Sequence, residues 1–183
     1  MIIGLSGAAG CGKSTAAQWL VNYEGFIELS FAKPLKAAVA DIFGFTNDQL
    51  YHPVCKEQID TYWHKSPREI MQIVGDGFRN LIDKDIWVTS LKRVIESPVY
   101  RGRDIVIADV RYPNECKFIR QIGGVCVCIK RAAPSLLDSR LQKHPSETAL
   151  DDMVFEHVLE NDGNLTDLYV KLNTLLEMIN NED

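Results

Sequence analysis

The chain has 183 residues, of which 46% are hydrophobic and 25% are charged, and its formal net charge is −5. This length and balance are typical of a globular domain with one core of ordinary size. The negative charge argues against a general binder of nucleic acid or of membrane surfaces, because both favour basic proteins. No apolar run approaches the roughly 20 residues of a membrane span, and the first residues lack the pattern of a signal peptide.

Apolar strands alternate with helical patterns along the chain. The expected elements are a strand over 1–6, a helix over 13–23, a strand over 25–31, helices over 32–45, 66–82 and 84–97, strands over 103–111, 123–131 and 153–161, and a helix over 164–179. Residues 46–66 show no clear period and are expected to leave the main sheet. The alternation predicts an α/β three-layer sandwich with a five-stranded, mainly parallel sheet.

Five cysteines are scattered along the chain without the spacing of a disulfide framework or a zinc site. Cys126 and Cys128 alternate with valines, so both are expected on one face of a buried strand, where cysteine acts as a small hydrophobic residue. Unpaired cysteines persist in a reducing compartment, which favours the cytoplasm.

A phosphate-binding pattern, G-x-x-x-x-G-K-[ST], follows the first expected strand and precedes the first expected helix. The glycines let backbone N–H groups converge on one point, to which the helix N-terminus adds partial positive charge. Lys13 is expected to reach the β- and γ-phosphates of a nucleoside triphosphate, Ser14 to bind Mg²⁺, and Thr15 to hold the α-phosphate. A glycine-rich turn with a chance lysine is the plainer interpretation, but the flanking elements favour the phosphate loop. The pattern is formed by Gly7, Ala8, Ala9, Gly10, Cys11, Gly12, Lys13 and Ser14.

Asp109 ends the apolar run "IVIAD", and the ligands of open parallel sheets bind beyond the carboxyl ends of the strands. Its carboxylate is therefore expected to hold the Mg²⁺ of the triphosphate, although an aspartate can also simply end a strand. The chain has no N-K-x-D-like segment that would recognise guanine, so a GTPase is not favoured.

The helix over 67–82 carries a polar stripe at helical spacing. Arginine binds phosphate through two parallel hydrogen bonds, so this stripe is a candidate site for an acceptor that is itself a phosphate. An ordinary solvated helix face would show the same spacing. The stripe comprises Arg68, Gln72, Asp76 and Arg79, and much of the opposite side comprises Ile70, Ile73, Val74 and Leu81.

Further cations follow the expected strands, where they would offset the charge of two phosphorylated substrates. Each of them alone is more often a surface charge than a ligand. The segment over about 131–150 is broken by prolines and fits a lid that excludes water. The cations are Lys33 and Lys36 after the second strand, Arg111 after the third, and Arg131, Arg140 and Lys143 after the fourth.

Taken together, these motifs resemble the bacteriophage-type deoxynucleoside monophosphate kinases, members of the P-loop nucleoside monophosphate kinase group. The resemblance covers nearly the whole chain and rests on "GAAGCGKST", "FAKPLKAAVA", "REIMQIVGDGFR", "DIWV", "IADVRYPNE", "HPSETAL" and "ENDGNLTDLY", in that order. It implies transfer of the γ-phosphate of ATP to a deoxynucleoside 5′-monophosphate, with ATP and Mg²⁺ bound. It also implies a single P-loop kinase domain over 1–183, with an acceptor-binding insertion at about 31–97 and the lid at about 131–150.

The same resemblance implies a role for each matching residue. Lys13, Arg68, Arg111 and Asp109 would form the catalytic set. Asn161, with Asp162 and Gly163, would lie in a loop near the adenine of ATP, although this tripeptide is also typical of a plain turn. On the acceptor side, the resemblance implies Lys33, Arg68, Arg79 and Arg111, with Gln72 and Trp87 near the base or sugar. At the lid it implies Arg131 on the side of ATP and Arg140 on the side of the acceptor.

Two other functions would use the same residues. Animal-type phosphomevalonate kinases look similar in the P-loop, in a D-V-R strand end and in an S-E lid segment. A regulatory module would instead bind ATP without transferring its phosphate. We expect small nucleotides as partners, with no nucleic acid and no membrane, and a homodimer is one option for assembly.

Overall fold

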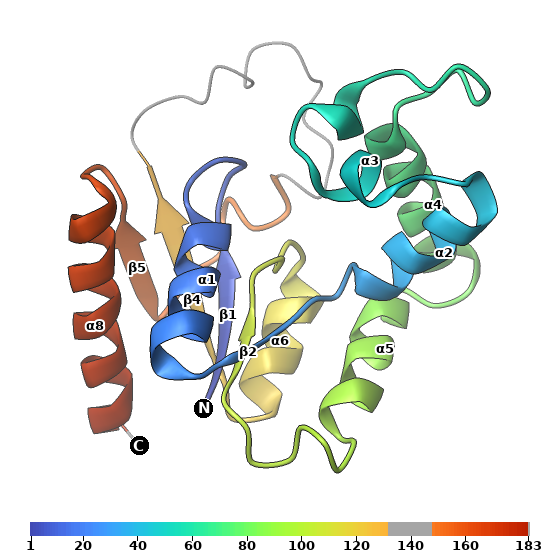
Figure 1. Ribbon diagram of the computed structural model, residues 1–183. Coiled ribbons are helices and arrows are strands. Elements are labelled where there is room, and N and C mark those ends of the chain that lie inside the picture. The colour runs from blue at the N-terminus through green and yellow to red at the C-terminus, as the bar shows by residue number, and fades with distance from the viewer. Residues whose placement is uncertain (132–147, 183) are drawn as a thin grey trace. The chain divides into compact units, whose positions relative to one another are not determined.

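The computed structural model describes residues 1–131 and 148–182. The chain divides into two compact units, residues 1–30 with 99–183 and residues 31–98. The first unit contains the sheet, whereas the regular elements of the second are all helical (Figure 1). Among the helices of the described residues, none is both long enough and apolar enough to cross a membrane.

The first unit is built on a parallel sheet that has five strands within the described residues (Figure 1). The strand order is β2-β3-β1-β4-β5, so the first strand of the chain is the central one. The expected fold class is therefore confirmed. The strands are β1 (Ile2–Ser6), β2 (Ile27–Leu29), β3 (Ile105–Ile107), β4 (Val125–Lys130) and β5 (His157–Glu160).

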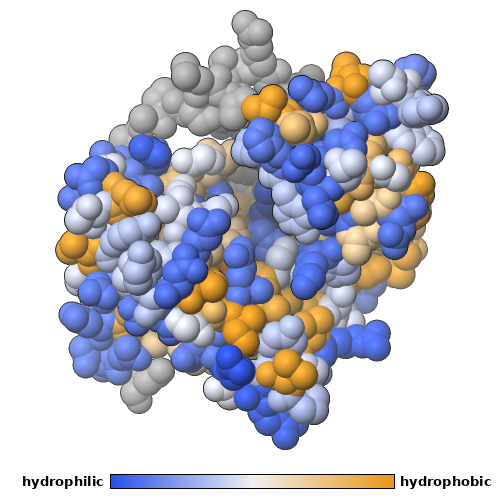
Figure 2. Space-filling view, in the orientation of Figure 1, coloured by the Kyte–Doolittle hydropathy of each residue, from blue (hydrophilic) through white to orange (hydrophobic). Residues whose placement is uncertain are grey.

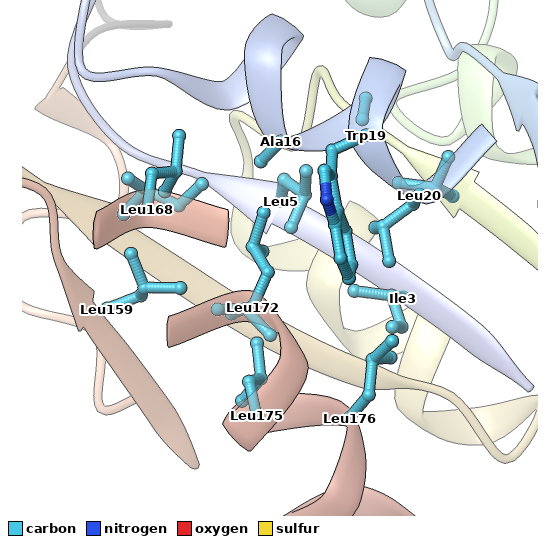
Figure 3. Close-up of a cluster of buried hydrophobic side chains, with 14 of the residues drawn as sticks. Ile3, Leu5, Ala16, Trp19, Leu20, Leu159, Leu168, Leu172, Leu175 and Leu176 are labelled. Atoms are coloured by element: carbon cyan, nitrogen blue, oxygen red, sulfur yellow. The ribbon is translucent and has the colours of Figure 1, made fainter. Parts of the chain in front are cut away.

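One face of the sheet is covered by α1 (Lys13–Glu24) and α8 (Leu165–Glu182). Figure 3 shows the leucines of α8 directed toward Trp19 and Leu20 of α1 and toward Ile3 and Leu5 of β1. All these side chains are nearly or completely buried, and removing their apolar surface from water is the main force that holds the layers together. The leucines of α8 in this core are Leu168, Leu172, Leu175 and Leu176.

The other face of the sheet is covered by α6 (Pro113–Gln121). A side chain at Gly4 would collide with Ile119, so the helix packs directly on the central strand. Cys126 pairs with Gly4 in the register and is fully buried, as expected for a small hydrophobic residue. Helices on both faces of one sheet give the expected three layers.

Helix α6 was not predicted from the sequence. Its nine residues, "PNECKFIRQ", are mostly polar, and one of its buried side chains is the carboxylate Glu115. A buried acid interrupts the apolar period that identifies an amphipathic helix. Strands β2, β3 and β5 are also shorter than expected from their apolar runs, which extend into the adjoining turns.

The second unit contains α2 (Lys33–Phe43), α3 (Asn47–Tyr51), η1 (Cys55–Glu57), α4 (Pro67–Leu81) and α5 (Ile86–Ile95). The segment without a period, 46–66, thus holds two short helices followed by a turn. Asp60 organises that turn, because its carboxylate accepts hydrogen bonds from the backbone of Tyr62 and Trp63 and from the side chain of Gln49. The Trp63 ring packs edge-on against Phe43, at a centroid distance of 4.9 Å.

Helix α4 begins as expected, with Ser66 as its N-cap and Pro67 in its first turn. Ser66 and Glu69 form a reciprocal capping box, and the hydrogen bonds from the Ser66 backbone and hydroxyl hold the pKa of Glu69 below its usual value. The apolar side of the helix differs from a simple core face. Ile70 is buried, but Ile73 is 57% exposed and Leu81 is 87% exposed.

Candidate active site

The loop after β1 takes a conformation that only glycine tolerates at several positions. Gly7 and Gly12 have φ values of +135° and +112°, which side-chain-bearing residues rarely adopt. A side chain at Gly7 would also collide with the carbonyl oxygen of Ile129 in β4. The sequence pattern therefore folds into a tight turn that is held against the neighbouring strand.

Lys13 begins α1 at the end of this loop. Its ammonium group donates hydrogen bonds to the carbonyl oxygens of Gly7 (2.6 Å) and Ala8 (2.8 Å), so it lies on the loop itself. Ser14 is exposed and Thr15 is half-buried in the first turn of the same helix. Because the N-cap, Gly12, has no side chain to cap the helix, the first turn can present its N–H groups to an anion.

Asp109 lies beside the start of the loop. Gly4 pairs with Ile107 in the sheet, and the N–H of Val110 donates to the carbonyl of Leu5, so β1 and β3 end side by side. The Ser30 hydroxyl, at the end of β2, donates to one oxygen of the Asp109 carboxylate at 2.7 Å. A carboxylate and the Ser14 hydroxyl are oxygen ligands of the kind that Mg²⁺ accepts, so the residues present fit that ion.

The Arg111 side chain is exposed, but its backbone is fixed by a hydrogen bond to a buried carboxylate. The buried carboxylate of Glu115 accepts hydrogen bonds from the N–H groups of Arg111 (2.7 Å) and Tyr112 (3.1 Å). No role for Glu115 or Ser30 was predicted from the sequence. A proline at the first position of a helix and a glutamate at the third are together a helix start signal. Pro113 and Glu115 show this pattern, which could have indicated the contact between Glu115 and the backbone of Arg111.

Asn161 follows β5 directly and is only 7% exposed. Its backbone N–H donates to the carbonyl of Lys130, and its side-chain amide donates to the carbonyl of Cys11 at 2.8 Å. The side chain therefore contacts the phosphate loop. Arg131, which follows β4, is exposed, and Arg140 lies outside the described residues together with most of the expected lid.

The polar stripe of α4 forms ion pairs within the second unit. Arg68 pairs through Nε with the carboxylate of Glu57 from η1, and both side chains are mostly buried. Arg79 and Asp76 lie 3.6 Å apart on the helix. Gln72 is half-buried, and Lys33 is exposed at the start of α2. No spacing in the sequence indicated Glu57, because it comes from the segment without a period.

Trp87 of α5 lies in the interior of the second unit and is 6% exposed. Its ring stacks on Phe78 of α4 at a centroid distance of 5.8 Å, and its indole N–H donates to the carbonyl of Gly75 at 3.3 Å. A side chain at Gly75 would crowd Leu35 of α2. These contacts join α4 to α5 and to α2, so Trp87 has a packing role whatever else it contacts.

A parallel sheet whose central strand runs through a phosphate loop into a helix is the architecture that the P-loop kinases share with other P-loop nucleotide-binding proteins. Solved structures agree. The chain matches shikimate kinase from Bacteroides thetaiotaomicron with a TM-score of 0.54 over 98% of each chain, at 17% sequence identity. That likeness shows the fold alone.

Relatives in sequence identify the family. Residues 51–172 match the deoxynucleotide monophosphate kinase family. A protein of Acanthamoeba polyphaga mimivirus, named as a candidate deoxynucleotide monophosphate kinase, is 34% identical over 94% of each chain. The deoxynucleoside-5′-monophosphate kinase of Escherichia phage T5 is 23% identical, over 88% of this chain and 89% of its own. The chain belongs to the deoxynucleotide monophosphate kinase family, which confirms the resemblance expected from its motifs.

Proposed function

We propose that the protein transfers the γ-phosphate of ATP to a deoxynucleoside 5′-monophosphate, giving ADP and the deoxynucleoside diphosphate. The observation that carries this proposal is a phosphate loop, with Lys13 across it, in a chain of the deoxynucleotide monophosphate kinase family. Family membership favours this reaction over a phosphomevalonate-type acceptor and over a module that only binds ATP.

On the donor side, the loop over Gly7–Gly12 and the N-terminus of α1 would bind the triphosphate. An incoming phosphate is an anionic acceptor, and it would draw the Lys13 ammonium away from the Gly7 and Ala8 carbonyls, which carry less charge. Ser14 and Asp109 would hold Mg²⁺, with Ser30 orienting the carboxylate. When bound, the ion supplies positive charge that offsets the charge of the phosphates.

On the acceptor side, we assign the monophosphate to the unit formed by residues 31–98. Arg68 and Arg79 of α4 would bind its phosphate, with Lys33 close by and with Gln72 and Trp87 toward its base or sugar. Glu57 supports this assignment, because its carboxylate fixes the Arg68 side chain in one position before any ligand arrives. Arg131 and Arg140 would close over both substrates.

The reaction needs no general base from the protein, because the attacking phosphate oxygen is already an anion. The work is to align two phosphates in line and to stabilise the charge that is shared between them. Arg111, whose backbone is fixed by Glu115, would contribute a cation at the carboxyl end of β3. We place the activity in the cytoplasm, where both nucleotides occur and where the five cysteines, all unpaired, stay reduced.

The test is a panel of acceptors. ADP formation from ATP and Mg²⁺ is measured with dAMP, dCMP, dGMP, dTMP, their ribose forms and phosphomevalonate. We expect turnover with at least one deoxynucleotide, and the pattern across the panel gives the base and sugar specificity. Turnover with phosphomevalonate alone would move the acceptor to another class, and ATP binding without any turnover would make the protein a regulatory module.

A further inference from the structure

The side-chain amide of Asn161 is committed to the phosphate loop. The residue follows the edge strand β5 and is 7% exposed, and its own N–H is anchored to the end of β4 through the Lys130 carbonyl at 2.7 Å. From this fixed backbone, Nδ2 reaches the carbonyl of Cys11 at 2.8 Å. A buried amide keeps such a partner, because leaving either group unpaired is costly.

This contact sets the direction of the next N–H in the loop. The peptide unit between Cys11 and Gly12 is trans, so its carbonyl and its N–H point in opposite directions. Because Asn161 holds the Cys11 carbonyl on one side, the Gly12 N–H is directed away from Asn161, on the other side of the same peptide plane. Backbone N–H groups of such loops are the donors that surround bound phosphates.

Gly12 depends on the same contact. Its φ is +112°, and a side chain there would collide with Nδ2 of Asn161. The second glycine of the sequence pattern is therefore required both by its own backbone conformation and by the amide that lies against it.

We propose that Asn161 is a positioning residue for the triphosphate, which acts by holding the Cys11–Gly12 peptide so that the Gly12 N–H donates to a phosphate oxygen. This differs from the role near the adenine that the family resemblance implied. The inference rests on the proposed function only in that the loop binds a polyphosphate. The same contribution of Asn161 is therefore expected for any triphosphate, with or without a nucleobase.

The test compares binding of ATP and of inorganic tripolyphosphate, both with Mg²⁺, by titration calorimetry on the full chain at constant ionic strength. Asn161→Ala removes the donor, and Asn161→Asp keeps the size but replaces the amide by a carboxylate that cannot donate. The control is Asn173→Ala, which removes an exposed asparagine from α8. We expect both Asn161 variants to lose about tenfold in affinity for each ligand, the loss expected for one well-placed hydrogen bond. The control should bind both ligands like the wild type.

Two results of this titration would overturn the inference. One is a loss of affinity for ATP with unchanged affinity for tripolyphosphate, which would indicate that Asn161 acts near the adenine instead. The other is unchanged affinity for both ligands. Far-UV circular dichroism and thermal unfolding establish that the variants are folded.

A second measurement uses the wild type alone and does not depend on the folding of any variant. The amide proton of Gly12 should move strongly downfield in ¹⁵N-resolved NMR spectra when tripolyphosphate is added, and an unmoved resonance would contradict the proposal. If no acceptor yields ADP while the Asn161 variants still lose tripolyphosphate affinity, the proposed function fails and this inference stands. A wild type that binds ATP but no tripolyphosphate would refute this inference alone.

Discussion

The two units of the chain hold their polar groups in place in different ways. In the sheet unit, the loop is shaped by backbone geometry and by contacts from the flanking strands, such as the Ile129 carbonyl against Gly7 and the Asn161 amide against Cys11. In the helical unit, the cations are held by other side chains, as Arg68 is by Glu57. Apart from a change to proline, a point substitution leaves a backbone donor in place, whereas a side-chain ion pair can be removed one partner at a time. The two units should therefore respond differently to mutation.

The largest effect is expected from Lys13→Ala. The variant keeps the loop backbone but loses the cation that lies on it, so kcat should fall about 10²- to 10³-fold. Steady-state kinetics with the best acceptor from the panel measures this, and circular dichroism verifies the fold. Lys92→Ala, which removes an exposed lysine of α5, is the control. A Lys13→Ala enzyme with near-native turnover would contradict the assignment of the phosphate loop.

The second largest effect is expected at the ion pair of Arg68 and Glu57 in the helical unit. Arg68→Ala should reduce kcat/KM for the deoxynucleoside monophosphate by about 10²-fold, because it removes a mostly buried cation that we assign to the acceptor phosphate. The affinity for ATP should stay unchanged. Glu57→Gln keeps Arg68 but weakens its anchor, and a reduction of only a few-fold is expected. Arg93→Ala on the exposed face of α5 is the control. Equal losses of ATP and acceptor affinity in Arg68→Ala would place that arginine outside the acceptor site.

Trp87 separates packing from ligand binding within the same unit. Trp87→Ala should lower the free energy of unfolding by about 3–5 kcal/mol, because it empties a buried site between α4 and α5. Trp87→Phe keeps an aromatic ring but loses part of the buried volume and the hydrogen bond to Gly75, so its cost should exceed about 1 kcal/mol and stay below that of Trp87→Ala. Urea unfolding measures both, with Tyr62→Ala, at 88% exposure, as a control expected within about 0.5 kcal/mol of wild type. A stable Trp87→Phe protein with a much higher KM for the acceptor would add a binding role.

The smallest effect is expected in the pH dependence of the stability that Glu156 contributes. In the sheet unit, Arg120 of α6 donates to Glu156 at 2.9 Å and holds the pKa of that carboxyl below its ordinary value of 4.5. A carboxyl with a lowered pKa in the folded state adds stability when it is ionised, and this addition disappears as pH falls through its folded-state pKa. The stability difference between wild type and Glu156→Gln should thus be constant near neutral pH and vanish in acid. Its size should be below about 1 kcal/mol, because Glu156 is 42% exposed. Urea unfolding at pH 7 and pH 3.5 tests this, and a difference that grows in acid would contradict it.

What the sequence could predict follows the same division. The phosphate loop was predictable because strand, loop and helix start follow one another without a break from Ile2 to Lys13. The sheet was predictable because each of its strands is a short apolar run. The contacts that orient the site were not, because they join distant segments, as Asn161 joins Cys11 across 150 positions. Helix α6 was missed because a buried carboxylate, Glu115, stands in its apolar face.

In the helical unit, periodicity placed Arg68 and Arg79 on one stripe, but it could not show which acid would pair with Arg68. It also could not show that Ile73 and Leu81 of the same helix would lie exposed on the surface.

Hydrophilic residues cover much of the face shown in Figure 2, and hydrophobic residues reach the surface in several places.

The position of Lys13 has a consequence for competition among anions. The ammonium group already has acceptors in the Gly7 and Ala8 carbonyls, so an arriving anion must exchange these hydrogen bonds rather than simply add its own. A singly charged anion would gain less from that exchange than a polyphosphate would. If Lys13 binds the triphosphate as we propose, the loop should therefore favour polyphosphates over chloride and other singly charged anions.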